Sequence, residues 1–150
     1  MKRGSTEVAL LVLGLAASGC GGEEEASPPA LVTNEVAVFV DDPEATWAGT
    51  GGSELSALLS FSVTYWGGSG NALAGWSLHI HHGGGGSTNV ESRSMSMGTE
   101  LGPCVGALPV PHEVGHAMLY LLTGDPDGHH TDPRWKTLPR PGCHKPAVTS

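Results

Sequence analysis

The chain has 150 residues, which is room for one domain, and its fifteen acidic residues outnumber its seven lysines and arginines. Setting aside Lys2, Arg3 and Glu7 in the leader leaves fourteen acidic residues against five basic ones. This balance argues against nucleic acid and anionic membrane surfaces as partners.

The first nineteen residues have the pattern of an export signal. Lys2 and Arg3 precede an apolar run at residues 8–17, whose length of about ten residues is too short to span a bilayer. Residues 17–20, Ala-Ser-Gly-Cys, resemble the lipobox of bacterial lipoproteins. The resemblance implies a signal peptide over residues 1–19 and lipidation of Cys20. The alternative is an ordinary secretory leader that leaves this cysteine free.

Both interpretations place the mature protein outside the cytoplasm, in the cell envelope or secreted. In the lipoprotein interpretation the lipid is the only membrane contact. Gly21, and not Asp, follows Cys20, which by resemblance to Gram-negative lipoproteins implies sorting to the outer membrane. Residues 20–30 lack large apolar side chains and are predicted to form a flexible tether. Residues 31–150 remain for one folded domain, which we expect to be monomeric.

Two segments begin this domain. Residues 31–40 alternate apolar and polar side chains and predict a strand that ends at residues 41–43, Asp-Asp-Pro. Residues 53–66 carry leucines at helical spacing and predict a helix, with Ser53 as its N-cap. A strand is the alternative for its second half, where Phe61, Val63 and Tyr65 alternate.

The middle of the domain has strand-like patterns. Residues 75–82 predict a strand with Trp76, Leu78 and Ile80 on one face and polar residues on the other. Residues 83–86, four glycines, predict a flexible loop, and residues 90–97 predict a further strand with a weaker pattern.

A second helix is predicted over residues 112–123. Pro111 suits the first helical turn, where a missing N–H costs nothing. Gly124 stands where a left-handed residue commonly ends a helix. Further on, residues 125–135 are rich in turn formers and polar side chains.

Cys104 and Cys143 are the two thiols that remain once Cys20 is assigned to the lipid anchor. An oxidising compartment favours a disulfide between them. Closing a loop of about forty residues contributes about 3 to 4 kcal/mol to stability in a chain-entropy estimate. The alternative is a pair of free thiols.

The main chemical signal is His112-Glu113-Val114-Gly115-His116. On a helix, residues four apart lie on one face, so both imidazoles can bind one tetrahedral Zn²⁺. Glu113 is rotated by about 100° from His112, from where it can reach a water on the open coordination position. There it can act as general base towards that water and as acid towards the leaving amine. A chance occurrence of the pattern is the alternative.

This segment resembles the active-site helix of the zincin metallopeptidases. The resemblance implies a small α+β domain, with a short twisted sheet packed on the HExxH helix and on one further helix. It also implies one zinc ion per chain, Glu113 as the catalytic residue, and protein or peptide substrates bound in extended form on an edge strand. No nucleic-acid partner is expected.

The third zinc ligand is not fixed by the spacing. Metzincins have Gly and His where this chain has Leu119 and Leu122, and gluzincins have a later Glu, whereas no Glu follows Glu113. The candidates after the helix are His129, His130, Asp132 and His144.

A resemblance to short bacterial lipoproteins with an HExxH helix and a distal histidine favours His130. It leaves His129 and Asp132 as alternative ligands or as partners of a ligand. Asp125, Asp127 or Asp132 can also accept the second ring N–H of a ligating histidine.

His79, His81 and His82 form a second histidine cluster. His79 and His81 share a strand face and are candidates for a second metal, although a solvated strand end fits them better.

The sequence therefore predicts zinc-dependent peptide-bond hydrolysis at the cell envelope. One alternative is a lipoprotein that holds zinc without turnover. Another is an envelope-interaction lipoprotein without metal.

Overall fold

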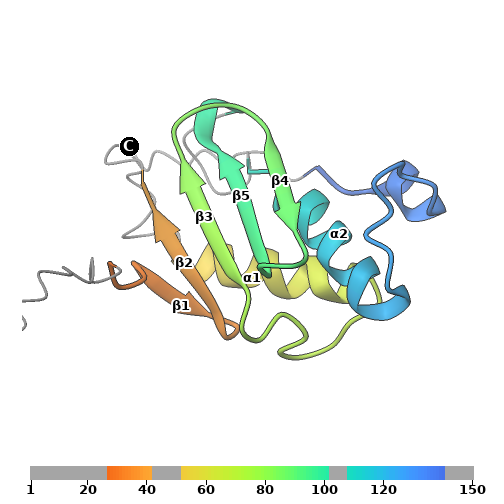
Figure 1. The fold of residues 1–150 in the computed structure, drawn as a ribbon, viewed down its shortest axis with the longest axis horizontal. Helices are drawn as coiled ribbons and strands as arrows, with labels where there is room; N and C mark the ends of the chain where they lie inside the picture. The colour runs from red at the N-terminus through yellow and green to blue at the C-terminus, as the bar shows by residue number, and fades with distance from the viewer. Residues whose placement is uncertain (1–26, 42–51, 102–107, 141–150) are drawn as a thin grey trace, which may run out of the picture.

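The computed structural model describes residues 27–41, 52–101 and 108–140. They form a five-stranded mixed sheet with two helices, an α+β domain, as Figure 1 shows. The elements in chain order are β1 (Leu31–Thr33), β2 (Val36–Val40), α1 (Gly52–Tyr65), β3 (Ser77–His81), β4 (Gly86–Asn89), β5 (Ser94–Gly98) and α2 (Val110–Thr123). Short 3₁₀ helices follow β5 and α2, at Thr99–Leu101 and Pro133–Thr137.

The strand order across the sheet is β1-β2-β3-β5-β4. Strands β2, β3 and β5 run parallel, whereas β1 and β4 are antiparallel to their neighbours. Within the described residues β4 is therefore an edge strand, and it lies next to α2 (Figure 1). Helix α1 connects the parallel strands β2 and β3, as a parallel pair requires.

The prediction of one strand over residues 31–40 was wrong in one respect, because the segment folds into a hairpin. Asn34 and Glu35 have φ of 51° and 60°, which gives the two-residue turn with two left-handed residues that suits strand twist. The Asn34 side chain also donates hydrogen bonds to the Ser56 carbonyl and the Ser60 hydroxyl of α1, at 3.1 and 2.9 Å. The signal for the turn was Asn34, which falls on the parity of Val36, Val38 and Val40 and so interrupts the alternation.

The predicted strand over residues 90–97 is also corrected. Residues 90–93 form a turn between β4 and β5, and the Asn89 side chain accepts the backbone N–H groups of Glu91 and Ser92 there. Gly86, expected in a loop, begins β4. This strand has the sequence Gly-Ser-Thr-Asn and so lacks the apolar alternation by which strands are recognised.

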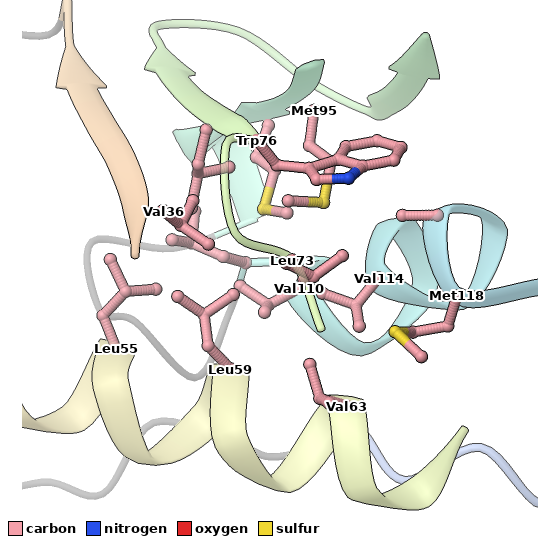
Figure 2. Packing of buried hydrophobic residues seen from close by; sticks show 14 of the residues in the cluster. Val36, Leu55, Leu59, Val63, Leu73, Trp76, Met95, Val110, Val114 and Met118 are labelled. Carbon is pink, nitrogen blue, oxygen red and sulfur yellow. The ribbon is translucent and has the colours of Figure 1, made fainter. Parts of the chain in front are cut away.

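The hydrophobic core lies between the sheet and the two helices (Figure 2). Leu55, Leu59 and Val63 of α1 point into it, which confirms the predicted helix and rules out the alternative strand. Leu78 and Ile80 of β3 are buried as predicted, and so is Trp76, which directly precedes this strand. Further core residues are Val36, Val38, Met95, Met97, Val114, Ala117 and Met118.

The opposite face of the sheet has a different composition. Val32 on β1 is 61% exposed, and the His79 ring stacks on Phe39 with centroids 4.8 Å apart.

Within residues 27–41, 52–101 and 108–140, no helix is long and apolar enough to span a membrane.

Candidate metal centre

Helix α2 presents His112 and His116 at the surface of the core. The helix begins at Val110, and Pro111 occupies its first turn as predicted. Its apolar face, which includes Val114, Ala117 and Met118, is buried, while the two histidines one turn apart are half-buried. The core therefore fixes the rotation of the helix that brings both imidazoles to one side.

The chain reverses direction after α2. Gly124 ends the helix in the left-handed conformation, with φ of 80°, and its N–H donates to the Tyr120 carbonyl. The following segment runs back along the helix (Figure 1) and brings His130, in the left-handed region with φ of 55°, to the two helix histidines.

The ring nitrogens of His112, His116 and His130, hereafter the histidine triad, converge. The distance from His116 Nε2 is 3.3 Å both to His112 Nε2 and to His130 Nε2. All three ligand atoms lie within 4.8 Å of one another. Three nitrogens bound to one tetrahedral Zn²⁺ at about 2.0 to 2.1 Å lie about 3.3 Å apart, so the spacing fits a metal ion with little adjustment.

Two features favour the metal-binding form of these imidazoles. His116 donates Nδ1–H to the Pro126 carbonyl at 2.7 Å, which leaves Nε2 as the nitrogen with a free lone pair. Burial, together with the nearby His116, His130 and Arg140, lowers the pKa of His112 from 6.5 to about 4. His112 is therefore neutral at physiological pH, and a neutral imidazole is the form that binds metals.

Asp127 holds the loop that carries His130. Its Oδ1 accepts the backbone N–H and the hydroxyl of Thr131, at 2.9 and 2.7 Å. Its Oδ2 accepts the Asp132 N–H and Trp135 Nε1–H, both at 2.7 Å. The hydrogen bond from the Asp132 backbone, with those from Thr131 and Trp135, holds the pKa of the Asp127 carboxyl well below its usual range. The carboxylate is therefore the organising group of this loop.

The indole of Trp135 packs against all three histidines. Its ring centroid lies 5.0, 4.8 and 4.5 Å from those of His112, His116 and His130. Its ring centroid also lies 4.4 Å from that of Trp66, which directly follows α1. A Trp therefore connects the loop, the helix histidines and the core.

Gly115, inside the His-Glu-Val-Gly-His segment, makes this packing possible. A Cβ there would come within 2.6 Å of Trp66 and 2.7 Å of Trp135. Trp66 also donates its indole N–H to the Pro111 carbonyl at 2.8 Å. The small residue is thus needed where the two indoles approach the helix.

Glu113 lies next to the triad but faces the sheet. It is 3% exposed, and Thr88 of β4 donates its hydroxyl proton towards Glu113 Oε2 at 2.7 Å, with the Glu113 carbonyl at 3.0 Å. Burial raises the pKa of the Glu113 carboxyl, while the Thr88 hydrogen bond and His116 act in the opposite direction. A buried carboxyl with a raised pKa is suited to accepting and returning a proton.

Asp132, an alternative ligand in the sequence, has another partner. Its carboxylate forms a bidentate ion pair with the Arg134 guanidinium, at 2.9 and 2.7 Å, and also accepts the Arg134 backbone N–H. It therefore caps the 3₁₀ helix Pro133–Thr137. His129 is exposed and is not one of the three histidines brought together.

The other predicted site residues are apart from this centre. His79 contacts Phe39 and the Ser77 hydroxyl on the sheet, and His81 donates Nδ1–H to the His82 carbonyl. In the part of the chain that the structure describes, they form no group of three metal-binding side chains. Cys20, Cys104, Cys143 and His144 lie outside the described residues.

Sequence reasoning missed Thr88 as the partner of Glu113, and it offered Asp127 only as one of three possible acceptors of a ring N–H from a ligating histidine. For His116 the acceptor of that N–H is the backbone carbonyl of Pro126. The signal for Asp127 was present in its turn sequence, Asp-Pro-Asp-Gly. No local signal points from Thr88 to Glu113, which is 25 residues away.

Comparison of the chain with protein-family models, with curated proteins and with solved structures gave no match.

Proposed function

We propose that this chain is a zincin-like metallopeptidase that hydrolyses peptide bonds in proteins or peptides at the cell envelope. The observation that carries the proposal is the convergence of His112, His116 and His130 beside a buried carboxyl, Glu113. Three protein ligands with a fourth position left for water or substrate are typical of catalytic zinc sites, whereas structural sites use four.

The donor set favours zinc. Imidazole nitrogens bind zinc well, and no thiolate or carboxylate joins the three-histidine group among the described residues. A bound zinc ion would supply Lewis acidity, polarising a water molecule and the substrate carbonyl. His116 would keep its ligand nitrogen directed at the ion because its other ring nitrogen is held by Pro126.

Glu113 would move the proton. Its carboxylate would take a proton from the attacking water as the water oxygen bonds to the carbonyl carbon. It would then deliver that proton to the amide nitrogen as the C–N bond breaks, so that a carboxylic acid and an amine result. Its raised pKa supports both roles.

Strand β4 would bind the substrate. As the edge strand beside α2, it pairs only with β5 among the described residues, and an extended peptide can add to such an edge through main-chain hydrogen bonds. A lipid on Cys20 and the tether over residues 20–30 would keep the domain at the envelope.

The test is a comparison of the parent chain with Glu113→Gln. Zinc content after dialysis should be about one per chain in both, because Glu113 is assigned no ligand role. Hydrolysis of a mixed peptide pool should fall by about 10²-fold to 10⁴-fold in the variant, since the amide cannot act as a base. A Glu113→Gln protein that hydrolyses peptides at the parent rate would contradict the mechanism.

A second candidate function is zinc holding without turnover. It is favoured by the deep burial of Glu113 and by its existing hydrogen bond to Thr88, which together resemble a structural position. The same measurement separates the two functions, because a zinc-holding lipoprotein would bind zinc and hydrolyse no peptide in either form.

A further inference from the structure

The helix-facing side of β4 differs from that of its neighbours. Pairing of β4 with β5 sets Gly86 opposite Met97 and Thr88 opposite Met95, so these two residues share the face on which the methionines are buried. Where the adjacent strand contributes large apolar side chains, β4 therefore contributes no side chain at one position and a hydroxyl at the other.

Both unusual residues meet the same carboxyl group. The Thr88 hydroxyl lies 2.7 Å from Glu113 Oε2. A Cβ added to Gly86 would come within 2.5 Å of Glu113 Oε1 and 2.9 Å of its carboxyl carbon. One carboxyl oxygen is thus hydrogen-bonded by β4, and the other packs against β4 where a side chain is missing.

The Thr88 hydroxyl has a second partner on the same residue. The Glu113 backbone carbonyl lies 3.0 Å from Thr88 Oγ1. A hydroxyl has one hydrogen and can rotate it, so Thr88 can donate either to the carboxylate or to the carbonyl while accepting from a protonated carboxyl. The contact can therefore persist before and after Glu113 takes up a proton.

We propose that Thr88, with Gly86 beside it, is a positioning residue that holds the Glu113 carboxyl group in its working orientation through both proton transfers. The inference rests on the proposed peptidase function and adds that the edge strand aligns the base as well as the substrate. A carboxyl group without this support would occupy several rotamers, and misplacement of a reacting group by about 1 Å can cost on the order of 10²-fold in rate.

A simple stabilising role is the competing explanation, because any buried carboxyl needs a hydrogen-bond donor. The two roles differ in what they change. Loss of a stabilising contact lowers the amount of folded, zinc-loaded protein but leaves each loaded molecule fully active. Loss of a positioning contact lowers kcat in molecules that are folded and loaded.

Four variants of the full chain separate them. Thr88→Val removes the donor but keeps the shape, and Thr88→Ser keeps the donor. Gly86→Ala pushes on the carboxyl group while Thr88 stays. Thr64→Val, which removes an exposed hydroxyl on α1 that bonds only the Ser60 carbonyl of its own helix among the described residues, is the matched control. Each is measured for zinc per chain, for kcat and KM per zinc-loaded molecule on a peptide pool, and for the visible absorption spectrum after cobalt(II) replaces zinc.

We expect Thr88→Val and Gly86→Ala to bind zinc at the parent stoichiometry. Their kcat should fall by about 10-fold to 100-fold with little change in KM. Their cobalt spectra should shift in the same direction as that of Glu113→Gln. Thr88→Ser and Thr64→Val should stay near the parent chain. The proposal fails if Thr88→Ser is no better than Thr88→Val, or if every loss follows the fraction of folded protein.

The same measurements test the peptidase function independently of the positioning role of Thr88. If the parent chain hydrolyses peptides and Thr88→Val does so equally well per zinc ion, hydrolysis stands and the positioning role fails. If the parent chain hydrolyses nothing but Thr88→Val still shifts the cobalt spectrum as Glu113→Gln does, the orientation of Glu113 by Thr88 stands and hydrolysis fails.

Discussion

The candidate metal centre is built from two regions that are held in place in different ways. Helix α2 contributes His112 and His116 from a segment whose opposite face lies in the core. The segment from Gly124 to Thr137 contributes His130 and is mostly exposed. The helix is fixed by backbone hydrogen bonds and apolar packing, while the loop is fixed by the side chains of Asp127 and Asp132 and by the Trp135 ring.

This difference predicts how each region responds to change. The loop contacts are made by partly exposed charged side chains outside the core, so their loss should weaken metal binding and leave the core folded. Changes in the buried helix should weaken folding and metal binding together. Mutations matched between the two regions can therefore separate metal affinity from stability.

The largest effect is expected from removing the loop ligand. His130→Ala should leave two ligands and abolish stoichiometric zinc binding, while the thermal unfolding of the metal-free chain stays close to that of the parent. The neighbouring variant His129→Ala should keep its zinc, because His129 lies outside the triad. Zinc content after dialysis against a weak chelator is the measurement.

Asp132→Ala extends this test. It removes the partner of Arg134 and should weaken zinc binding less than His130→Ala does. Full zinc retention in His130→Ala combined with loss in Asp132→Ala would instead make Asp132 the ligand.

A large effect on both properties is expected from Gly115→Ala in the helix. The added methyl group would meet Trp66 and Trp135, and such overpacking typically costs about 1 to 3 kcal/mol. Urea unfolding of the metal-free chain should show this loss, and zinc affinity should fall because Trp135 contacts all three histidines.

Gly128→Ala in the loop is the matched control, since nothing lies within 4 Å of a Cβ there. Equal unfolding curves for the two alanine variants would show that the indoles move aside and that Gly115 is not needed for packing.

The loop framework is tested by Asp127→Asn. Asparagine has one acceptor oxygen where the carboxylate has two, so the bonds to Thr131 or those to Asp132 and Trp135 are lost. Zinc affinity should fall by about 10-fold to 100-fold, as for other groups that orient a ligand. The unfolding midpoint of the metal-free chain should change little.

Asp125→Asn provides the comparison, because Asp125 accepts one hydrogen bond, from the Asp127 N–H through Oδ1, and an amide oxygen can replace it. A loss of affinity as large in Asp125→Asn as in Asp127→Asn would point to general loop charge as the cause.

Much of the fold was predictable because its periodic segments are long and amphipathic. Helix α1, strand β3 and helix α2 were expected within a few residues of their observed bounds. The β1–β2 turn and strand β4 were not, because a single polar residue on the apolar face, Asn34, marks the turn and the sequence of β4 has no apolar residue.

The residues of the candidate site also include some that the sequence predicts and some that it does not. His112 and His116 lie one turn apart on one helix, so spacing alone predicted that their imidazoles share a face. The choice of His130 over His129 depended on a resemblance, because the direction of a loop side chain depends on hydrogen bonds that connect Asp127 to residues further along the chain. The Thr88–Glu113 contact depends on strand order, which no local pattern contains.

The smallest effect is expected from the pH dependence of the metal-free chain, and it again concerns the buried helix. Folding lowers the pKa of His112 from 6.5 to about 4, first through burial and then through His116, His130 and Arg140. Between these two pH values the unfolded chain binds a proton at this residue that the folded chain does not, so the free energy of unfolding should decrease as pH falls from 6.5 towards 4. Above pH 6.5 both states are neutral at this position, and its contribution should be constant.

Urea unfolding at a series of pH values, for the parent chain and for His112→Asn, isolates the effect, because the asparagine variant has no proton to bind there. Parallel curves for the two proteins through this window would show that His112 titrates normally in the folded chain, and that burial by the helix does not keep it ready for a metal ion.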